Sequence, residues 1–112
     1  MKKIEIIIRP EKLDVVRKAL ELAGCQGLMI TDIEGHGKQK GVVQQWRGEK
    51  YKLGLLPKIK IETIVKDRDV DRIVKITISN AKIGEIGDGK IFISAVENAI
   101  RIRTFEQGDS AL

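Results

Sequence analysis

The segment around residue 87 combines residue types that could hold a phosphate group. Gly84, Gly87 and Gly89 are closely spaced, and Lys90 follows the last of them. Such glycines let successive backbone N–H groups point into one concavity, and the lysine adds positive charge, so the segment could form an anion-binding nest. The spacing also matches a Walker A loop, but Ile91 stands where that motif needs a magnesium-binding Ser or Thr. An ordinary turn with an Asp-Gly pair at its tip explains the spacing equally well.

Two further groups of residues could contact an anionic ligand. Gly35, Gly37 and Lys38 belong to a glycine-rich stretch, 35–41, which does not match the dinucleotide-binding fingerprint. Arg101 and Arg103 lie in a segment, 100–103, that is expected to be extended. Residues i and i+2 of an extended segment share a face, so the two guanidinium groups would point together and could bind polyphosphate. Paired surface arginines without a role are equally common.

The sequence has no arrangement of residues that is typical of catalysis or of a metal centre. His36 is the single histidine, and no nucleophile is paired with it in the sequence. Cys25 is the single cysteine and is expected to be a half-buried packing residue. The Cys and His residues therefore do not have metal-ligand spacing. These observations favour a binding protein over an enzyme.

The periodicity of the apolar residues predicts the elements that would position these groups. Strands are expected at 3–9, 28–34, 58–65 and 91–96, where apolar and polar residues alternate or branched residues cluster. Helices are expected after Pro10, ending at Gly24, and over 70–81, with Asp67 or Asp69 as the cap of the second. The order β-α-β-β-α-β is the ferredoxin-like α+β arrangement, with both helices on one face of a four-stranded antiparallel sheet.

The other face of this sheet is expected to need a cover. It would carry Ile7, Met29, Ile33 and Ile64 among charged residues, which is too apolar for full exposure to water. Burial against further copies of the chain is the simplest solution. The length of 112 residues indicates one domain with a modest core, and self-association would add to its stability.

A segment of some twenty residues, 35–55, has no clear periodicity, and loops of that length are usually functional. Trp46 and Tyr51 lie inside it, where aromatic rings are suited to contacts with a partner, although both rings could instead fold back onto the domain. Residues 36–60 carry a net charge of +6, against −1 for the rest of the chain. This concentration of charge indicates an anionic partner, although a solvated basic loop is as plausible on charge alone.

Composition is consistent with a cytoplasmic protein. A single cysteine permits no intramolecular disulfide, which fits a reducing compartment. Glu5 and Arg9-Pro10 interrupt the first apolar run, so no signal-peptide core is expected. No apolar stretch approaches the roughly 18 residues that would span a membrane.

These three elements, in this order, resemble the PII family of signal-transduction proteins over residues 1–104. The resemblance rests on five stretches, which are highly specific together: Gly35-x-Gly37-Lys38-Gln39-Lys40-Gly41, Arg47-Gly48-x-x-Tyr51, Leu56-Pro57-Lys58-x-Lys60-Ile61-Glu62, Ile86-Gly87-Asp88-Gly89-Lys90-Ile91-Phe92 and Ile100-Arg101-Ile102-Arg103-Thr104. It implies one PII domain over 1–112, with a T-loop at about 37–55, a phosphate-binding loop at 82–90 and a C-terminal loop at about 98–112.

The resemblance also implies a set of ligands and the residues that bind them. The protein would be a cytoplasmic homotrimer that binds ATP or ADP, magnesium and 2-oxoglutarate in clefts between its subunits. Arg101 and Arg103 would reach the nucleotide from the neighbouring subunit. The full nucleotide set would be Met29, Gly35, Gly37, Lys38, Gln39, Ile64, Gly87, Asp88, Gly89, Lys90, Arg101 and Arg103. The 2-oxoglutarate set would be Gly37, Gln39, Lys40, Gly41 and Lys58, with Gln39 coordinating the magnesium ion.

The partners implied by the resemblance are ammonium channels and enzymes or regulators of nitrogen assimilation. Membrane contact would be indirect, through a channel, and no nucleic acid is expected. Arg47 stands where channel-blocking members insert an arginine, and Tyr51 stands where some bacterial members are uridylylated. Met29 replaces a threonine often found against the nucleotide, and His36 replaces a common phenylalanine. The T-loop is more basic than usual, because Gln44, Lys50 and Gly54 replace residues that are commonly acidic.

Two other classes use the same β-α-β-β-α-β order. An RNA-binding module needs aromatic platforms on its central strands, and only Phe92 meets that requirement here. A phosphohydrolase of the acylphosphatase type would use an arginine to bind phosphate. Neither alternative accounts for the long 35–55 segment or for the Gly-Asp-Gly-Lys sequence at 87–90.

Overall fold

The computed structural model describes residues 1–35, 43–46, 49–52 and 56–112; for Gly35 and for the two short segments it describes the backbone only. Four strands make the main sheet: β1 (Lys2–Ile8), β2 (Met29–Gly35), β5 (Leu56–Val65) and β6 (Lys90–Ala95). Two helices connect them, α1 (Leu13–Leu22) and α2 (Val70–Ala81), each preceded by a turn of 3₁₀ helix, Pro10–Lys12 and Asp67–Asp69. A last 3₁₀ turn spans Gly108–Ala111.

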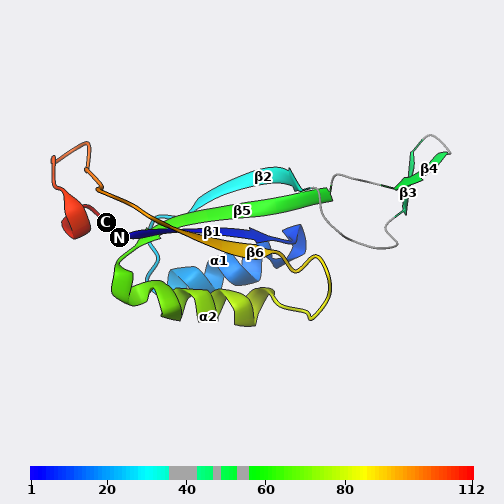
Figure 1. The fold of residues 1–112 in the computed structure, drawn as a ribbon, viewed down its shortest axis with the longest axis horizontal. Helices are drawn as coiled ribbons and strands as arrows, with labels where there is room; N and C mark the ends of the chain where they lie inside the picture. The colour runs from blue at the N-terminus through cyan, green and yellow to red at the C-terminus, as the bar shows by residue number, and fades with distance from the viewer. Residues whose placement is uncertain (36–42, 47–48, 53–55) are drawn as a thin grey trace.

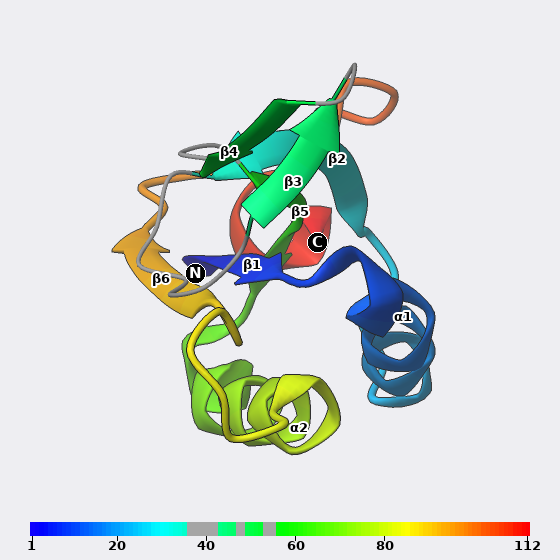
Figure 2. The same ribbon diagram turned by 90° about the vertical axis from the view of Figure 1, so that its right-hand side faces the viewer.

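The sheet has the predicted ferredoxin-like topology. Its strand order is β2-β5-β1-β6, and every neighbouring pair is antiparallel. Both helices lie side by side on one face of it, which Figure 2 shows along the strands. The predicted order and the predicted layers are therefore confirmed, with strand ends that differ from the predicted ones by one or two residues.

The core lies between this face and the helices. Ile6 on β1 is paired with Ile61 on β5 and with Ile91 on β6, so the three side chains point to the helices together. Val16 and Leu20 on α1 and Ile73 on α2 close the layer, and all three are buried. Cys25 is also buried, which agrees with its predicted packing role.

Gly24 ends α1 as the sequence predicts. The N–H of Cys25 donates to the carbonyl of Leu20 at 3.0 Å, and that of Gly24 donates to the carbonyl of Glu21 at 3.1 Å. These two bonds form a Schellman motif, which needs a residue with positive φ at the position of Gly24 (φ +97°).

The predicted aspartate cap of α2 is wrong. Asp69 has helical backbone angles, and neither it nor Lys66, which precedes the 3₁₀ turn, makes a side-chain cap hydrogen bond. The carboxylate of Asp67 lies 2.9 Å from the α-amino group of Met1, and that of Asp69 lies 3.4 Å from Arg72. Opposite charges thus hold both side chains away from the helix N–H groups.

The open face of the sheet mixes apolar side chains with ion pairs. Ile7, Met29, Ile33 and Ile64 lie on it, as predicted, and Phe92 is the one aromatic residue that the four described strands present there. Lys3 pairs with Glu5 at 2.8 Å, and Lys60 pairs with Glu62 at 3.1 Å. This face therefore combines apolar and charged side chains, and the described residues of a single chain leave it uncovered.

The 35–55 segment is not wholly irregular, which corrects the expectation from its periodicity. Strands β3 (Val43–Trp46) and β4 (Glu49–Lys52) form an antiparallel pair with Trp46 opposite Glu49. The pair lies beyond the ends of β2 and β5 (Figure 1).

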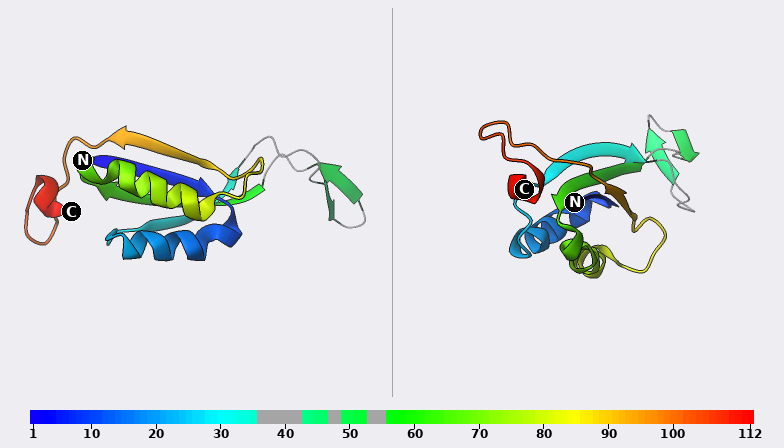
Figure 3. Two further views of the ribbon diagram at one scale, coloured as in Figure 1. Left: turned by 90° about the horizontal axis from the view of Figure 1, so that it is seen from below. Right: turned by 60° about the vertical axis from the view of Figure 1, so that its left-hand side comes forward.

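The segment 100–103 is not extended, which overturns a second expectation. Ile100 pairs with Gln107, and the N–H of Phe105 donates to the carbonyl of Arg101 at 2.8 Å, so residues 102–104 form a turn. Phe105 has φ +61°, which is unusual for a residue other than glycine. Arg101 and Arg103 therefore do not share the face of a strand. This C-terminal segment lies at the end of the molecule opposite the β3–β4 pair (Figure 3).

Neither α1 nor α2, the two α-helices in the described ranges, is long and apolar enough to cross a membrane.

Truncation of two leucines on α1 should change the stability of the protein by very different amounts. Leu20 is fully buried, whereas Leu22 is 85% exposed. Leu20→Ala should lower the free energy of unfolding by about 3–5 kcal/mol, because it leaves a cavity in the core. Leu22→Ala should change it by less than about 0.5 kcal/mol. Urea titrations at one protein concentration measure both, and equal effects would contradict the assignment of the core.

Candidate functional site

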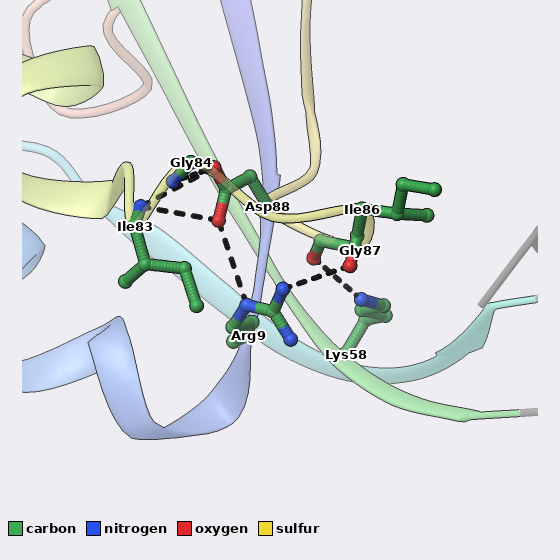
Figure 4. Close-up of polar contacts among 7 residues, drawn as sticks. All are labelled: Arg9, Lys58, Ile83, Gly84, Ile86, Gly87 and Asp88. Carbon is green, nitrogen blue, oxygen red and sulfur yellow. Dashed lines mark hydrogen bonds and ion pairs between the residues drawn. The ribbon is translucent and has the colours of Figure 1, made fainter. Parts of the chain in front are cut away.

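The 82–90 loop joins α2 to β6 and lies where β1 ends. Figure 4 shows it beside Arg9, which follows β1, and Lys58, which lies on β5. Gly84, Gly87 and Gly89 all have positive φ, between +88° and +110°. At Gly89 a side chain is also excluded by space, because a Cβ atom there would overlap the carbonyl oxygen of Ile7. The loop thus lies directly against the β1 backbone.

The carboxylate of Asp88 turns inward and closes the loop on itself. It accepts hydrogen bonds from the N–H of Gly84 at 2.9 Å and from the N–H of Ile83 at 3.2 Å. Burial alone would raise the pKa of Asp88, but these N–H groups and the nearby Arg9 outweigh it, so the pKa lies below its usual value. The N–H groups of Ile83 and Gly84 thus converge on the loop's own carboxylate, and the phosphate nest expected from Gly84, Gly87 and Gly89 stays a prediction.

Two cations from the sheet hold two consecutive carbonyls of the loop. Arg9 Nη2 donates to the carbonyl of Ile86 at 2.9 Å, and Lys58 Nζ donates to the carbonyl of Gly87 at 2.9 Å (Figure 4). Burial lowers the pKa of Lys58, and repulsion by Arg9 lowers it further. Lys58 would therefore gain from an anionic partner at its ammonium group.

The remaining groups of the loop could bind an anion. In the described part of the chain, the N–H of Gly87 and that of Gly89 donate to no backbone carbonyl of the loop. Lys90 follows them on the first position of β6, with an exposed side chain. Backbone N–H groups beside ammonium and guanidinium groups suit the oxygens of a phosphate or carboxylate.

Four other described residues of the predicted nucleotide site lie toward the opposite end of the sheet: Met29, Ile64, Arg101 and Arg103. Met29 and Ile64 line a cavity of about 580 Å³ there, together with Arg72 and the C-terminal Leu112. Lys58 and Ile64 are six residues apart on β5, which corresponds to roughly 20 Å of strand. Gly35, in contrast, ends β2 at the same end of the sheet as Lys58. One chain therefore does not bring the predicted set together.

Arg101 and Arg103 belong to this distant group. Arg101 Nη1 lies 3.1 Å from Glu106 Oε1, and its Nη2 lies 3.4 Å from the carbonyl oxygen of Ser110. Arg103 is exposed. The guanidinium of Arg101 would have to exchange these contacts to bind a ligand.

Several predicted site residues lie outside the described ranges. They are Gly37, Lys38, Gln39, Lys40, Gly41 and Arg47. Tyr51 lies on β4, where the backbone alone is described. Their roles stay predictions.

Sequence reasoning did not identify Arg9 as a site residue. Its place next to Pro10 marked only the end of a strand. The loop that it contacts lies 77 positions away at Ile86. No pattern in the sequence around Arg9 predicts that contact.

Comparison with known proteins places the chain among regulators. The family model described as "Nitrogen regulatory protein P-II" matches residues 1–106. The chain is 52% identical over its whole length to "Nitrogen regulatory protein P-II 2" of Methanothermobacter thermautotrophicus, of which it covers 97%. It is 52% identical to "Nitrogen regulatory protein P-II" of Cereibacter sphaeroides and 50% identical to that of Nostoc punctiforme, with both chains covered completely in each comparison.

The loop geometry predicts a difference between two glycine substitutions. Gly84→Ala meets no neighbouring atom, so it costs backbone strain alone, about 1 kcal/mol. Gly89→Ala has a similar φ but also overlaps the Ile7 carbonyl, so it should cost at least 2 kcal/mol more. Chemical denaturation compares the two variants with the parent. Equal losses would show that the loop does not lie against β1 at Gly89.

Proposed function

The chain belongs to the nitrogen regulatory protein P-II family, and on that premise we propose that it senses ATP or ADP together with 2-oxoglutarate. The observation that carries this proposal is the 82–90 loop, whose consecutive carbonyls at Ile86 and Gly87 are held by Arg9 and Lys58 and which is followed directly by Lys90. Such a set favours a ligand with several negative charges. The proposed role is binding and signalling in the cytoplasm, with no catalytic step.

The phosphates of the nucleotide would lie against the second half of the loop. The N–H groups of Gly87 and Gly89 would bind phosphate oxygens, and Lys90 would contribute its ammonium group. Asp88 would take part through its position in the backbone, because its carboxylate is bonded to Ile83 and Gly84. Lys38 and Gly37 would approach from the T-loop.

Assembly would complete the nucleotide site. Ile64 lies roughly 20 Å from Lys58 along β5. Met29 and the C-terminal segment that carries Arg101 and Arg103 lie toward the same end of the sheet as Ile64. A second copy of the chain could supply them to the loop of the first. A homotrimer would then hold three equivalent sites, each between two subunits. The open face of the sheet, with its apolar residues and the Lys3–Glu5 and Lys60–Glu62 pairs, is the surface available for this assembly.

Lys58 would bind a carboxylate of 2-oxoglutarate. Its ammonium group already lies at the loop, where burial and then repulsion by Arg9 lower its pKa, so a further counter-ion would stabilise it. A carboxylate would supply that counter-ion. Gln39, Lys40 and Gly41 of the T-loop would complete the site for the metabolite.

Magnesium would enter with the nucleotide. The described residues hold no cluster of three or more His, Cys, Asp or Glu side chains that could bind a metal ion. Mg²⁺ is commonly held by phosphate oxygens together with one or two protein groups. Gln39 is the proposed protein ligand, and the ion would neutralise charge between nucleotide and metabolite.

The T-loop, residues 37–55, would bind the target proteins. Its net positive charge suits an acidic surface, and Arg47 and Tyr51 are the proposed contact or modification points. The proposed partners are an ammonium channel, through which the protein would reach the membrane, and enzymes or regulators of nitrogen assimilation. Bound ligands would select the conformation of the loop.

Linkage between the two ligands tests the proposed sensing. 2-Oxoglutarate should bind with Mg-ATP at least fivefold more tightly than with ADP, since coupled sites commonly differ by about 1–3 kcal/mol. Lys58→Met should remove metabolite binding and reduce ATP affinity by less than about tenfold, because it loses one hydrogen bond to the loop. Lys75→Met, an exposed lysine on α2, is the matched control. Calorimetry that gives the same metabolite affinity with either nucleotide would count against the proposal.

A mass measurement tests the proposed assembly. Light scattering on a size-exclusion column should give three times the 12.5 kDa of one chain at micromolar concentration. The uncovered apolar residues of the open sheet face are the reason for this expectation. A mass of one chain under these conditions would refute the trimer and, with it, the shared site.

A further inference from the structure

Asp88 places a negative charge inside a loop that is proposed to bind phosphates. Its neighbours Gly87, Gly89 and Lys90 are the groups assigned to the phosphate oxygens. An uncompensated carboxylate so close to a polyphosphate would repel it. The carboxylate should therefore have a structural role in the loop, and a nearby cation should neutralise its charge.

The structural role of Asp88 lies in its hydrogen bonds. Its carboxylate binds the N–H groups of Ile83 and Gly84, which fixes the first half of the loop immediately after α2. An apolar side chain at this position would leave those N–H groups without their acceptor. Asp88 is thus part of the architecture of the loop.

Among the residues whose side chains the structure describes, Arg9 is the cation that forms an ion pair with Asp88. Arg9 Nε lies 3.6 Å from Asp88 Oδ1, and Arg9 Nη2 donates to the carbonyl of Ile86 at 2.9 Å. The side chain of Arg9 is only 12% exposed. Figure 4 shows the guanidinium between the carboxylate and the tip of the loop. One planar group thus contacts both the charge and the backbone of the loop.

Lys58 cannot substitute for Arg9 in this position. It contacts the loop through one hydrogen bond, to the Gly87 carbonyl, and the proposed function assigns its ammonium group to the metabolite. Arg9 makes two contacts with groups of the loop itself. A guanidinium keeps its charge at every accessible pH and offers several donors in fixed directions, which an ammonium group does not.

We propose that Arg9 is a positioning residue for nucleotide binding: it neutralises Asp88 and holds the Ile86 carbonyl, so that the second half of the loop presents its N–H groups to phosphate. This inference rests on the proposed function, because it concerns the same nucleotide site. Arg9 acts on the ligand through the loop. Its effect should therefore grow with the number of phosphate charges that lie near Asp88.

Charge-changing variants test this role. Arg9→Gln should weaken ATP binding by tenfold or more, weaken ADP binding less and leave AMP binding almost unchanged. Asn can still accept the N–H bonds of Ile83 and Gly84 through its amide oxygen, so Asp88→Asn keeps the loop closed without the charge. Adding Asp88→Asn to Arg9→Gln should therefore recover most of the lost ATP affinity. Arg68→Gln, at an exposed arginine of the second 3₁₀ turn, is the matched control.

Two outcomes of the titrations would overturn the proposal. One is an unchanged ATP affinity in Arg9→Gln. The other is a double variant, Arg9→Gln/Asp88→Asn, that binds ATP more weakly than Arg9→Gln does. If both residues had purely structural roles, the losses of ATP affinity would add. If Arg9→Gln does not fold, Arg9→Lys takes its place. It keeps the charge but cannot hold both contacts, so it should bind ATP at least several-fold more weakly than the parent, and an ATP affinity equal to that of the parent would overturn the proposal.

Hydrogen exchange gives a readout that needs no ligand. In Arg9→Gln the amides of Ile83 and Gly84 should exchange at least several-fold faster than in the parent and in Arg68→Gln, because Asp88 loses its partner. Unchanged exchange would overturn the positioning role. If neither the parent nor Arg68→Gln binds an adenine nucleotide, the proposed function fails, and the exchange rates still decide whether Arg9 positions the loop.

Discussion

The closure of the 82–90 loop by Asp88 is the contact on which the candidate site depends. The carboxylate joins the end of α2 to the start of β6 through the N–H groups of Ile83 and Gly84. Gly89 then lies against the Ile7 carbonyl, where no side chain fits. Because the loop is fixed at both points, Arg9 and Lys58 can reach consecutive carbonyls from the sheet. The positions of the cations follow from the path of the loop.

Structural features that local residue patterns encode were predicted correctly from the sequence. Alternation at Ile4, Ile6 and Ile8 identified β1 and the face that it buries, and Gly24 identified the end of α1. The turn at 102–104 was missed, because a bond from the Phe105 N–H to the Arg101 carbonyl and a positive φ at Phe105 leave no periodic trace.

Contacts between distant residues explain the other misses. Asp67 and Asp69 look like helix caps until the partners that hold their carboxylates, the Met1 amino group and Arg72, are known. Arg9 likewise has no local signal, because its partner at Ile86 is 77 positions away. The glycines that turn the 82–90 loop could therefore be predicted from the sequence, whereas the contact of Arg9 with that loop could not.

Mixed assemblies test most directly whether two chains share each nucleotide site, as we propose. Lys90→Ala damages the loop group, and Arg101→Ala/Arg103→Ala damages the distant group, so neither variant alone should bind ATP well. When the two are unfolded and refolded together in equal amounts, about one quarter of the sites in random trimers should combine an intact loop with intact arginines. Recovery of that fraction in an ATP titration is the predicted result. Mixed trimers that form and recover no binding would contradict the shared site.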